Sequence, residues 1–285
     1  MKTNNSLDFL TSLRGLAALW VVIYHIRSHF ENYIPAVILE IVSKGYLAVD
    51  FFFVLSGFII SMSYQKKVKL TDLKTIKIFF QKRIARIYPL HLFMLVCYLL
   101  IPIAYYVTDK PLVQGSYAIN DFLLSLLLIN NWGLNNGLSW NIPSWSISTE
   151  FAAYLLFPLL TLFFKCEKII IYILYIGIVI FILYHIFSFH NANHLGDNVS
   201  QLSLVRCIVE FFIGMCVWNI YSEIEGTKIY QSVCILVVSF LIMIGVINSA
   251  LQEVIFFPIA LALLLFGLVT FNEQHKLKIL FLPVL

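Results

Sequence analysis

The chain has 285 residues, of which 61% are hydrophobic and only 12% are charged, and its mean hydropathy is +0.90. In soluble domains roughly a quarter of all residues are charged, so this composition excludes a soluble globular protein. The net charge of +4 is small, and we interpret it as a record of membrane topology and not of nucleic-acid binding.

Long apolar stretches recur along the chain and predict an all-α, polytopic membrane protein. The predicted spans are residues 10–26, 46–63, 88–107, 145–164, 169–187, 202–221, 229–248 and 254–271. A shorter apolar segment covers residues 121–129, and another begins at Leu277 and is cut off at Leu285. We therefore expect about nine to ten transmembrane or re-entrant helices, the last one truncated, in a single membrane-embedded domain over residues 1–285.

The first span contains Arg14 and His25, eleven positions apart. At about 100° per residue both side chains return to one helix face, roughly 16 Å apart along the axis. Ionisable groups inside a membrane span are costly and mark a functional site by default. The spacing therefore predicts a functional pathway along this helix.

The second span contains Asp50, in an otherwise apolar run that ends in Ser56 and Gly57. A carboxylate in such a run needs a partner, and Arg14 or His25 is the obvious candidate. An ion pair that compensates charge is favoured over direct catalysis by Asp50. Gly57 predicts close helix packing, and a nucleophilic role for Ser56 is less favoured.

The segment between the second and third spans is strongly basic and predicts a cytoplasmic loop, which places the N-terminus inside as well. Its cations, against the single acid Asp72, are Lys66, Lys67, Lys69, Lys74, Lys77, Lys82, Arg83 and Arg86. Arg83 and Arg86 are three apart, so a helix presents both on one side. They fit a positive-inside anchor or, as the sharper hypothesis, a clamp for phosphate groups.

The apolar segment 121–129 is shorter than the roughly 20 residues that a spanning helix needs. A segment that dips in and returns also leaves more of the later Lys and Arg on the cytoplasmic side than one that crosses. We therefore expect it to be re-entrant. The polar loop 130–144 and the start of the next span then lie on the outer side, near the level of His25.

Glu150 follows the polar run 145–149 at the start of an apolar span. It fits a favourable charge at a helix N-terminus, or a carboxylate that orients His25 and raises its basicity. The residues His185, His190 and His194 are interpreted as solvated loop residues, because their spacing suits no zinc site. No metal is predicted.

Taken together, these segments resemble the bacterial membrane acyltransferase 3 family. The resemblance rests on Arg14 and His25, on the runs 50–58 and 83–89, and on the run 145–150 that leads to Tyr154 and Pro158. A weaker later signature covers residues 206–211 and Gly214. Two positions depart from the family pattern: Phe151 stands where a second carboxylate is usual, and Ala48 stands where glycine is common.

The resemblance implies an O-acyltransferase of the cytoplasmic (inner) membrane. Its donor would be cytoplasmic acetyl-CoA or another acyl-CoA, and its acceptor a hydroxyl of a cell-surface or lipid-linked glycan. Arg14, Arg83 and Arg86 would bind the donor, and His25, supported by Glu150 or Asp50, would act as the catalytic base. Two other classes remain open: a secondary transporter or glycan exporter, and a non-catalytic membrane scaffold.

Overall fold

A computed structural model describes residues 8–109, 111, 117–134, 137–165, 168–224 and 226–275. Within these ranges the chain forms ten α-helices joined by short 3-10 turns and loops, without a strand, which confirms the all-α prediction. Eight helical segments of the described residues are long and apolar enough to cross a membrane. The protein is therefore a multi-pass membrane protein. The predicted helix after Leu277 lies outside the described residues.

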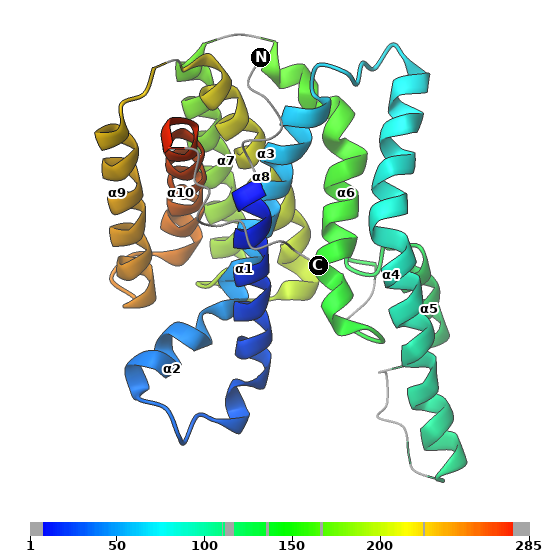
Figure 1. The fold of residues 1–285 in the computed structure, drawn as a ribbon. Helices are drawn as coiled ribbons and strands as arrows, with labels where there is room; N and C mark the ends of the chain where they lie inside the picture. The colour runs from blue at the N-terminus through cyan, green and yellow to red at the C-terminus, as the bar shows by residue number, and fades with distance from the viewer. Residues whose placement is uncertain are drawn as a thin grey trace. The chain divides into compact units, whose positions relative to one another are not determined.

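Figure 1 shows the helices along the chain. They are α1 (Asp8–Ile26), α2 (Ala36–Ser43), α3 (Ala48–Tyr64), α4 (Leu73–Val107), α5 (Ile119–Leu126), α6 (Trp145–Leu160), α7 (Ile169–Phe189), α8 (Val199–Glu223), α9 (Ile229–Ile247) and α10 (Glu253–His275). Each of the eight predicted spans has a corresponding long helix. The short helix α2, which has no buried residue, has no counterpart among the predicted spans.

Helix α4 differs most from its predicted span, which began at residue 88. It begins at Leu73, because the carboxylate of Asp72 accepts hydrogen bonds from the backbone N–H groups of Lys74 (3.0 Å) and Thr75 (3.4 Å). An aspartate at this position satisfies N–H groups that have no partner within the helix. The predicted basic loop is thus largely helical. With 35 residues, α4 is about 52 Å long, far more than the roughly 30 Å of a hydrocarbon core.

The described residues form two compact units, and each is considered by itself. The first comprises those within 1–60, 166–196 and 209–285, and the second those within 61–165 and 197–208. In the first unit, α10 packs against α9 and α7. Helices α3 and α8 cross at two glycines: a Cβ at Gly57 would overlap the backbone of Phe211, and one at Gly214 would overlap that of Val54. The close packing predicted at Gly57 is confirmed.

In the second unit, α5 lies beside the middle of α4 (Figure 1). The Tyr88 hydroxyl donates to the carbonyl of Leu126 (2.9 Å), and His91 Nε2 lies 2.8 Å from the carbonyl of Ser125. These carbonyls end α5, which has only eight residues and is about 12 Å long. A helix of this length cannot cross a bilayer, which favours the re-entrant interpretation. Just beyond it, Leu128 accepts a hydrogen bond from Ser148 in the first turn of α6 (2.9 Å).

Candidate functional site

The predicted site residues divide between the two units. Arg14, His25 and Asp50 belong to the first unit, whereas Arg83, Arg86 and Glu150 belong to the second. The predicted pairing of His25 with Glu150 joins the two units and stays a prediction. Within each unit the contacts of these side chains are defined.

In the first unit, α1 is unbroken from Asp8 to Ile26, so Arg14 and His25 keep the helical register that the sequence predicted. His25 is exposed, and its ring stands 5.2 Å from that of Tyr24 in an edge-on contact. Arg14 is half-buried. Asp50 lies in the first turn of α3 and is completely buried. The choice of partner for Asp50 also stays a prediction.

Arg83 and Arg86 occupy different environments although they are three residues apart on α4. Arg83 is only 9% exposed, whereas Arg86 is exposed. The Arg83 guanidinium donates to the Tyr64 hydroxyl (3.3 Å) and lies 5.1 Å from the Tyr64 ring and 6.0 Å from the Tyr154 ring. Its Nε has no hydrogen-bond partner in the described part of the chain. A buried guanidinium with an unmatched N–H is suited to bind an anion.

Glu150 is half-buried on α6, one helical turn before Tyr154. Its Oε1 accepts a hydrogen bond of 2.6 Å from the Tyr154 hydroxyl. Because the Tyr154 ring also faces Arg83, this tyrosine connects the predicted carboxylate to the predicted guanidinium. The sequence feature that indicates this contact is the i, i+4 spacing of Glu150 and Tyr154, which places both on one helix face.

A polar network lies at the start of α6 in the second unit. The Asn131 amide donates to the carbonyl of Val199 (3.2 Å) and to the Ser203 hydroxyl, and the Asn130 amide donates to the Ser144 hydroxyl (3.1 Å). The carbonyl oxygens of both asparagines are buried without a hydrogen-bond partner among the described residues. The Trp132 indole donates to the carbonyl of Ser148 (3.0 Å). The described residues of the polar loop 130–144 are therefore packed and not merely solvated.

Sequence analysis missed Glu253, the first residue of α10, which is 3% exposed. Its carboxylate accepts from Lys44 Nζ (2.9 Å), from the Tyr46 hydroxyl (2.8 and 2.9 Å) and from the backbone N–H of Leu195 (2.7 Å), and it lies 3.3 Å from His194 Nδ1. The signal was available: a carboxylate beside an apolar span needs partners.

Two of the three histidines predicted as solvated loop residues differ from that description. His194 has a half-exposed side chain but contacts the Glu253 carboxylate, because the loop after α7 folds over the start of α10. His185 lies within α7, exposed, with its ring 4.3 Å from that of Phe181. In the described ranges, three or more His, Cys, Asp or Glu side chains do not gather in a group that could hold a metal ion.

The comparisons with known proteins identify the family of the chain. The profile of the acyltransferase 3 family, described as an acyltransferase domain, matches residues 7–284. The acyltransferase MdmB of Streptomyces mycarofaciens is 35% identical over 158 residues, which cover 54% of this chain and 38% of MdmB. The O-acetyltransferase OatA of Staphylococcus aureus is 27% identical over 225 residues, which cover 71% of this chain and 34% of OatA.

A third relative, named protein 2 in the picA locus of Rhizobium radiobacter, is 32% identical over 152 residues, which cover 50% of this chain and 75% of that protein. The matches therefore span little more than a third of MdmB and OatA. No solved structure matches the chain.

Proposed function

The chain belongs to the acyltransferase 3 family, and we propose that it is an integral membrane O-acyltransferase. The proposed reaction moves an acyl group, acetyl by the likeness to OatA, from cytoplasmic acyl-CoA to a hydroxyl of an extracytoplasmic carbohydrate. The observation that carries the proposal is the buried Arg83 with its unmatched Nε, connected through Tyr154 to Glu150. It supports the proposal because a guanidinium suited to bind an anion and a candidate catalytic carboxylate share one cluster of the second unit.

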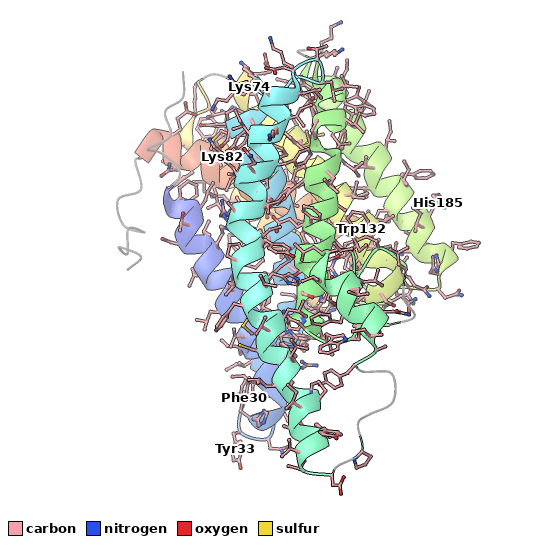
Figure 2. The ribbon with its side chains drawn as sticks, turned by 90° about the vertical axis from the view of Figure 1, so that its right-hand side faces the viewer. Phe30, Tyr33, Lys74, Lys82, Trp132 and His185 are labelled. Atoms are coloured by element: carbon pink, nitrogen blue, oxygen red, sulfur yellow. The ribbon has the colours of Figure 1, made fainter. Side chains whose placement is uncertain are left out.

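The proposed orientation follows from the charge of α4. Its Lys and Arg residues all lie in the N-terminal part of the helix. Figure 2 shows Lys74 and Lys82 there, with Trp132 farther toward the opposite end. Positive charge beside a span favours the cytoplasmic side. We therefore place the N-terminus in the cytoplasm and the protein in the cytoplasmic membrane. In this orientation Arg14 is nearer the cytoplasm and His25 nearer the outer side.

The donor would bind first through its phosphates. Arg83 offers a pre-positioned guanidinium, exposed Arg86 offers a second, and Arg14 offers a third at the inner part of α1. Guanidinium groups match phosphate oxygens in bidentate fashion, which suits the several phosphates of CoA. The roughly 16 Å from Arg14 to His25 is then the distance along which the thioester arm must extend.

The acyl transfer itself can be written as a single displacement. His25 accepts the proton of the acceptor hydroxyl while that oxygen attacks the thioester carbonyl carbon. The C–O bond forms, the C–S bond breaks, and the departing CoA sulfur receives the proton from the imidazolium. Glu150 or Asp50 would stabilise the imidazolium between these two proton transfers. An acyl-enzyme route through a side chain is the alternative sequence of steps.

The test is acyl transfer by the purified chain in lipid nanodiscs, with labelled acetyl-CoA and an oligosaccharide acceptor. His25→Ala is expected to lower turnover by about 10²- to 10⁴-fold, the range that a general base contributes. His29→Ala is the matched control, because His29 is exposed in the turn that follows α1. Near-normal turnover by His25→Ala removes the mechanism. Proton-coupled uptake without CoA dependence would instead indicate a transporter.

A further inference from the structure

We propose that the first unit binds a glycolipid, with its uncharged sugar headgroup beside Glu253 and its hydrocarbon chain in a groove lined by α1, α3, α9 and α10. The inference rests on the proposed function and deepens it, because it names the form in which the acceptor hydroxyl arrives. Two cavities of the first unit, one apolar and one polar, support this inference.

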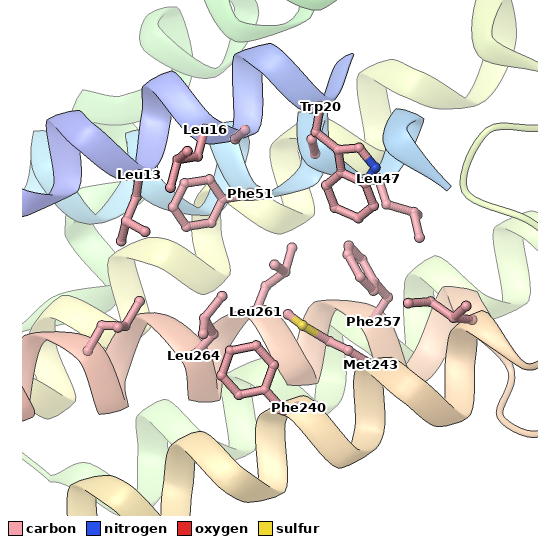
Figure 3. A pocket seen from close by; sticks show the side chains of 14 residues that line it. Leu13, Leu16, Trp20, Leu47, Phe51, Phe240, Met243, Phe257, Leu261 and Leu264 are labelled. Carbon is pink, nitrogen blue, oxygen red and sulfur yellow. The ribbon is translucent and has the colours of Figure 1, made fainter. Parts of the chain in front are cut away.

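The apolar cavity has a volume of about 320 Å³ (Figure 3). Its lining is Leu13, Leu16, Ala17, Trp20, Leu47, Ala48, Phe51, Phe240, Met243, Ile247, Phe257, Leu261, Leu264 and Leu268. Figure 3 shows two facing rows of these side chains, with Leu13, Leu16 and Trp20 of α1 opposite Phe240 and Met243 of α9 and Leu264 of α10. No charged side chain takes part in this lining.

The apolar cavity is a groove with a buried floor and exposed rims. Phe51, Phe257 and Leu261 are at most 8% exposed, whereas Leu16 and Phe240 are 58% and 55% exposed. The opening therefore runs between two membrane-spanning helices, α1 and α9. Apolar rims at this depth face the hydrocarbon of a bilayer, so the groove admits a lipid chain from the side.

The second cavity has a volume of about 270 Å³ and a polar lining. Its polar residues are Asn193, His194, Ser249, Gln252 and Glu253. Amide, hydroxyl and imidazole groups together donate and accept hydrogen bonds, as sugar hydroxyls require. Lys44 already neutralises the Glu253 carboxylate. The lining contains no lysine or arginine that could pair with a phosphate headgroup, which would therefore stand beside the carboxylate without a cation. The chemistry thus favours an uncharged, hydroxyl-rich headgroup over an anionic one.

Both cavities lie along one face of α10. Glu253, Phe257, Leu261, Leu264 and Leu268 are three or four residues apart, so they share one helix face. The first of them lines the polar cavity and the other four line the groove. Along the helix axis this face covers about 22 Å, well within a hydrocarbon core of roughly 30 Å. A polar end followed by an apolar groove fits a molecule with a sugar head and a lipid tail.

Aromatic contacts connect the polar cavity to the proposed base. The Tyr46 hydroxyl donates to Glu253, and the Tyr46 ring stands 5.8 Å from that of Tyr24. The Tyr24 ring in turn stands 5.2 Å from that of His25. A sugar bound beside Glu253 is therefore held on the same unit and at the same end of α1 as His25.

Binding of radiolabelled dodecyl maltoside to the full chain tests the inference, in nanodiscs prepared without any sugar detergent and without acyl-CoA. The wild-type chain should bind dodecyl maltoside at least about tenfold more tightly than maltose, which has no chain, or dodecylphosphocholine, which has no sugar. Gln252→Ala, at an exposed headgroup position, and Leu261→Trp, which fills the groove, should each weaken binding about tenfold. The control Leu241→Trp, at a 61% exposed position of α9 outside the groove, should leave binding unchanged.

Equal affinity for dodecylphosphocholine would overturn the inference and identify the groove as a general lipid crevice. Unchanged binding by Gln252→Ala would overturn it too, and this variant changes no buried residue. Because no donor is present, these outcomes are independent of acyl transfer. If a soluble oligosaccharide is acylated while dodecyl maltoside fails to bind, the proposed function stands and the glycolipid site falls.

Discussion

Two carboxylates near helix starts, Glu253 and Glu150, have opposite surroundings. Glu253 is 3% exposed, and four groups from two other segments of the chain surround its carboxylate. Glu150 is half-buried, and the one hydrogen bond that the described part of the chain gives it comes from Tyr154. The difference separates a carboxylate that holds loops together from one that can change partners during a reaction.

The physical reason lies in desolvation. A buried carboxylate is stable only when its lone pairs are fully used, and Lys44, Tyr46 and Leu195 use those of Glu253. A carboxylate that must stabilise a transient imidazolium needs lone pairs that are open to a new donor. Glu150 meets this condition and Glu253 does not. Four substitutions test this difference and the cluster around Glu150, and each should have a weaker effect than the one before it.

Glu253→Ala should destabilise the protein by about 3–5 kcal/mol, because Lys44 is left as a poorly solvated cation without its partner. Thermal unfolding in nanodiscs measures the loss. Glu223→Ala, at an exposed position at the end of α8, is the control and should change stability little. Equal stability of the Glu253 variant and wild type would show that the contacts of Glu253 with Lys44, Tyr46 and Leu195 do not stabilise the protein.

Glu150→Gln should lower turnover by about 10²-fold while thermal stability stays near that of wild type. The amide keeps the size of the side chain and can still accept from Tyr154, but it cannot balance a positive imidazole. Turnover with acetyl-CoA and the unfolding temperature are measured on the same preparation. A large loss of stability at unchanged turnover would reverse the roles assigned to Glu150 and Glu253.

Arg83→Lys should raise the KM for acetyl-CoA about tenfold with a smaller effect on kcat. A lysine keeps the charge but loses the planar fork and the free Nε–H that the guanidinium offers. Arg86→Lys is the comparison, since Arg86 is exposed and its environment is less restrictive. An unchanged KM for both variants would show that these arginines do not bind the donor.

Tyr154→Phe should lower turnover about fivefold, the effect of losing roughly 1 kcal/mol from one hydrogen bond to Glu150. The ring remains, so the packing beside Arg83 is kept. If the hydroxyl acts only through Glu150, the double variant with Glu150→Gln should lose no more turnover than Glu150→Gln alone. Additive losses would give Tyr154 a separate role.

Much of the fold could be predicted because each long helix carries its own signal. Apolar length predicted the eight spans, and Gly57 predicted the tight crossing of α3 with α8. The sequence predicts a span from residue 88, whereas α4 begins at Leu73, because the run of charges ends the apolar signal but not the helix that Asp72 caps. Helix α2 was missed because its eight residues are too few to give a reliable period.

The candidate residues of the site could be chosen from the sequence, but their contacts could be predicted only in part. Sequence spacing placed Arg83 and Arg86 on one side of a helix, but it could not show that one is buried and the other exposed. Sixty degrees of rotation around α4 separate them, and the packing of Tyr64 and Tyr154 decides which one turns inward. The i, i+4 spacing of Glu150 and Tyr154 could be seen in the sequence, but their hydrogen bond could be identified only from the structure of α6.

The sequence by itself determined that this is a helical membrane protein of the acyltransferase 3 family, because hydropathy and motif order are local properties of the chain. Only the tertiary structure decided that Glu253 gathers Lys44, Tyr46 and His194, residues up to 209 positions away along the chain. It alone revealed the groove between α1 and α9. Such features arise from side chains that meet across helices, and no local pattern records which helices become neighbours.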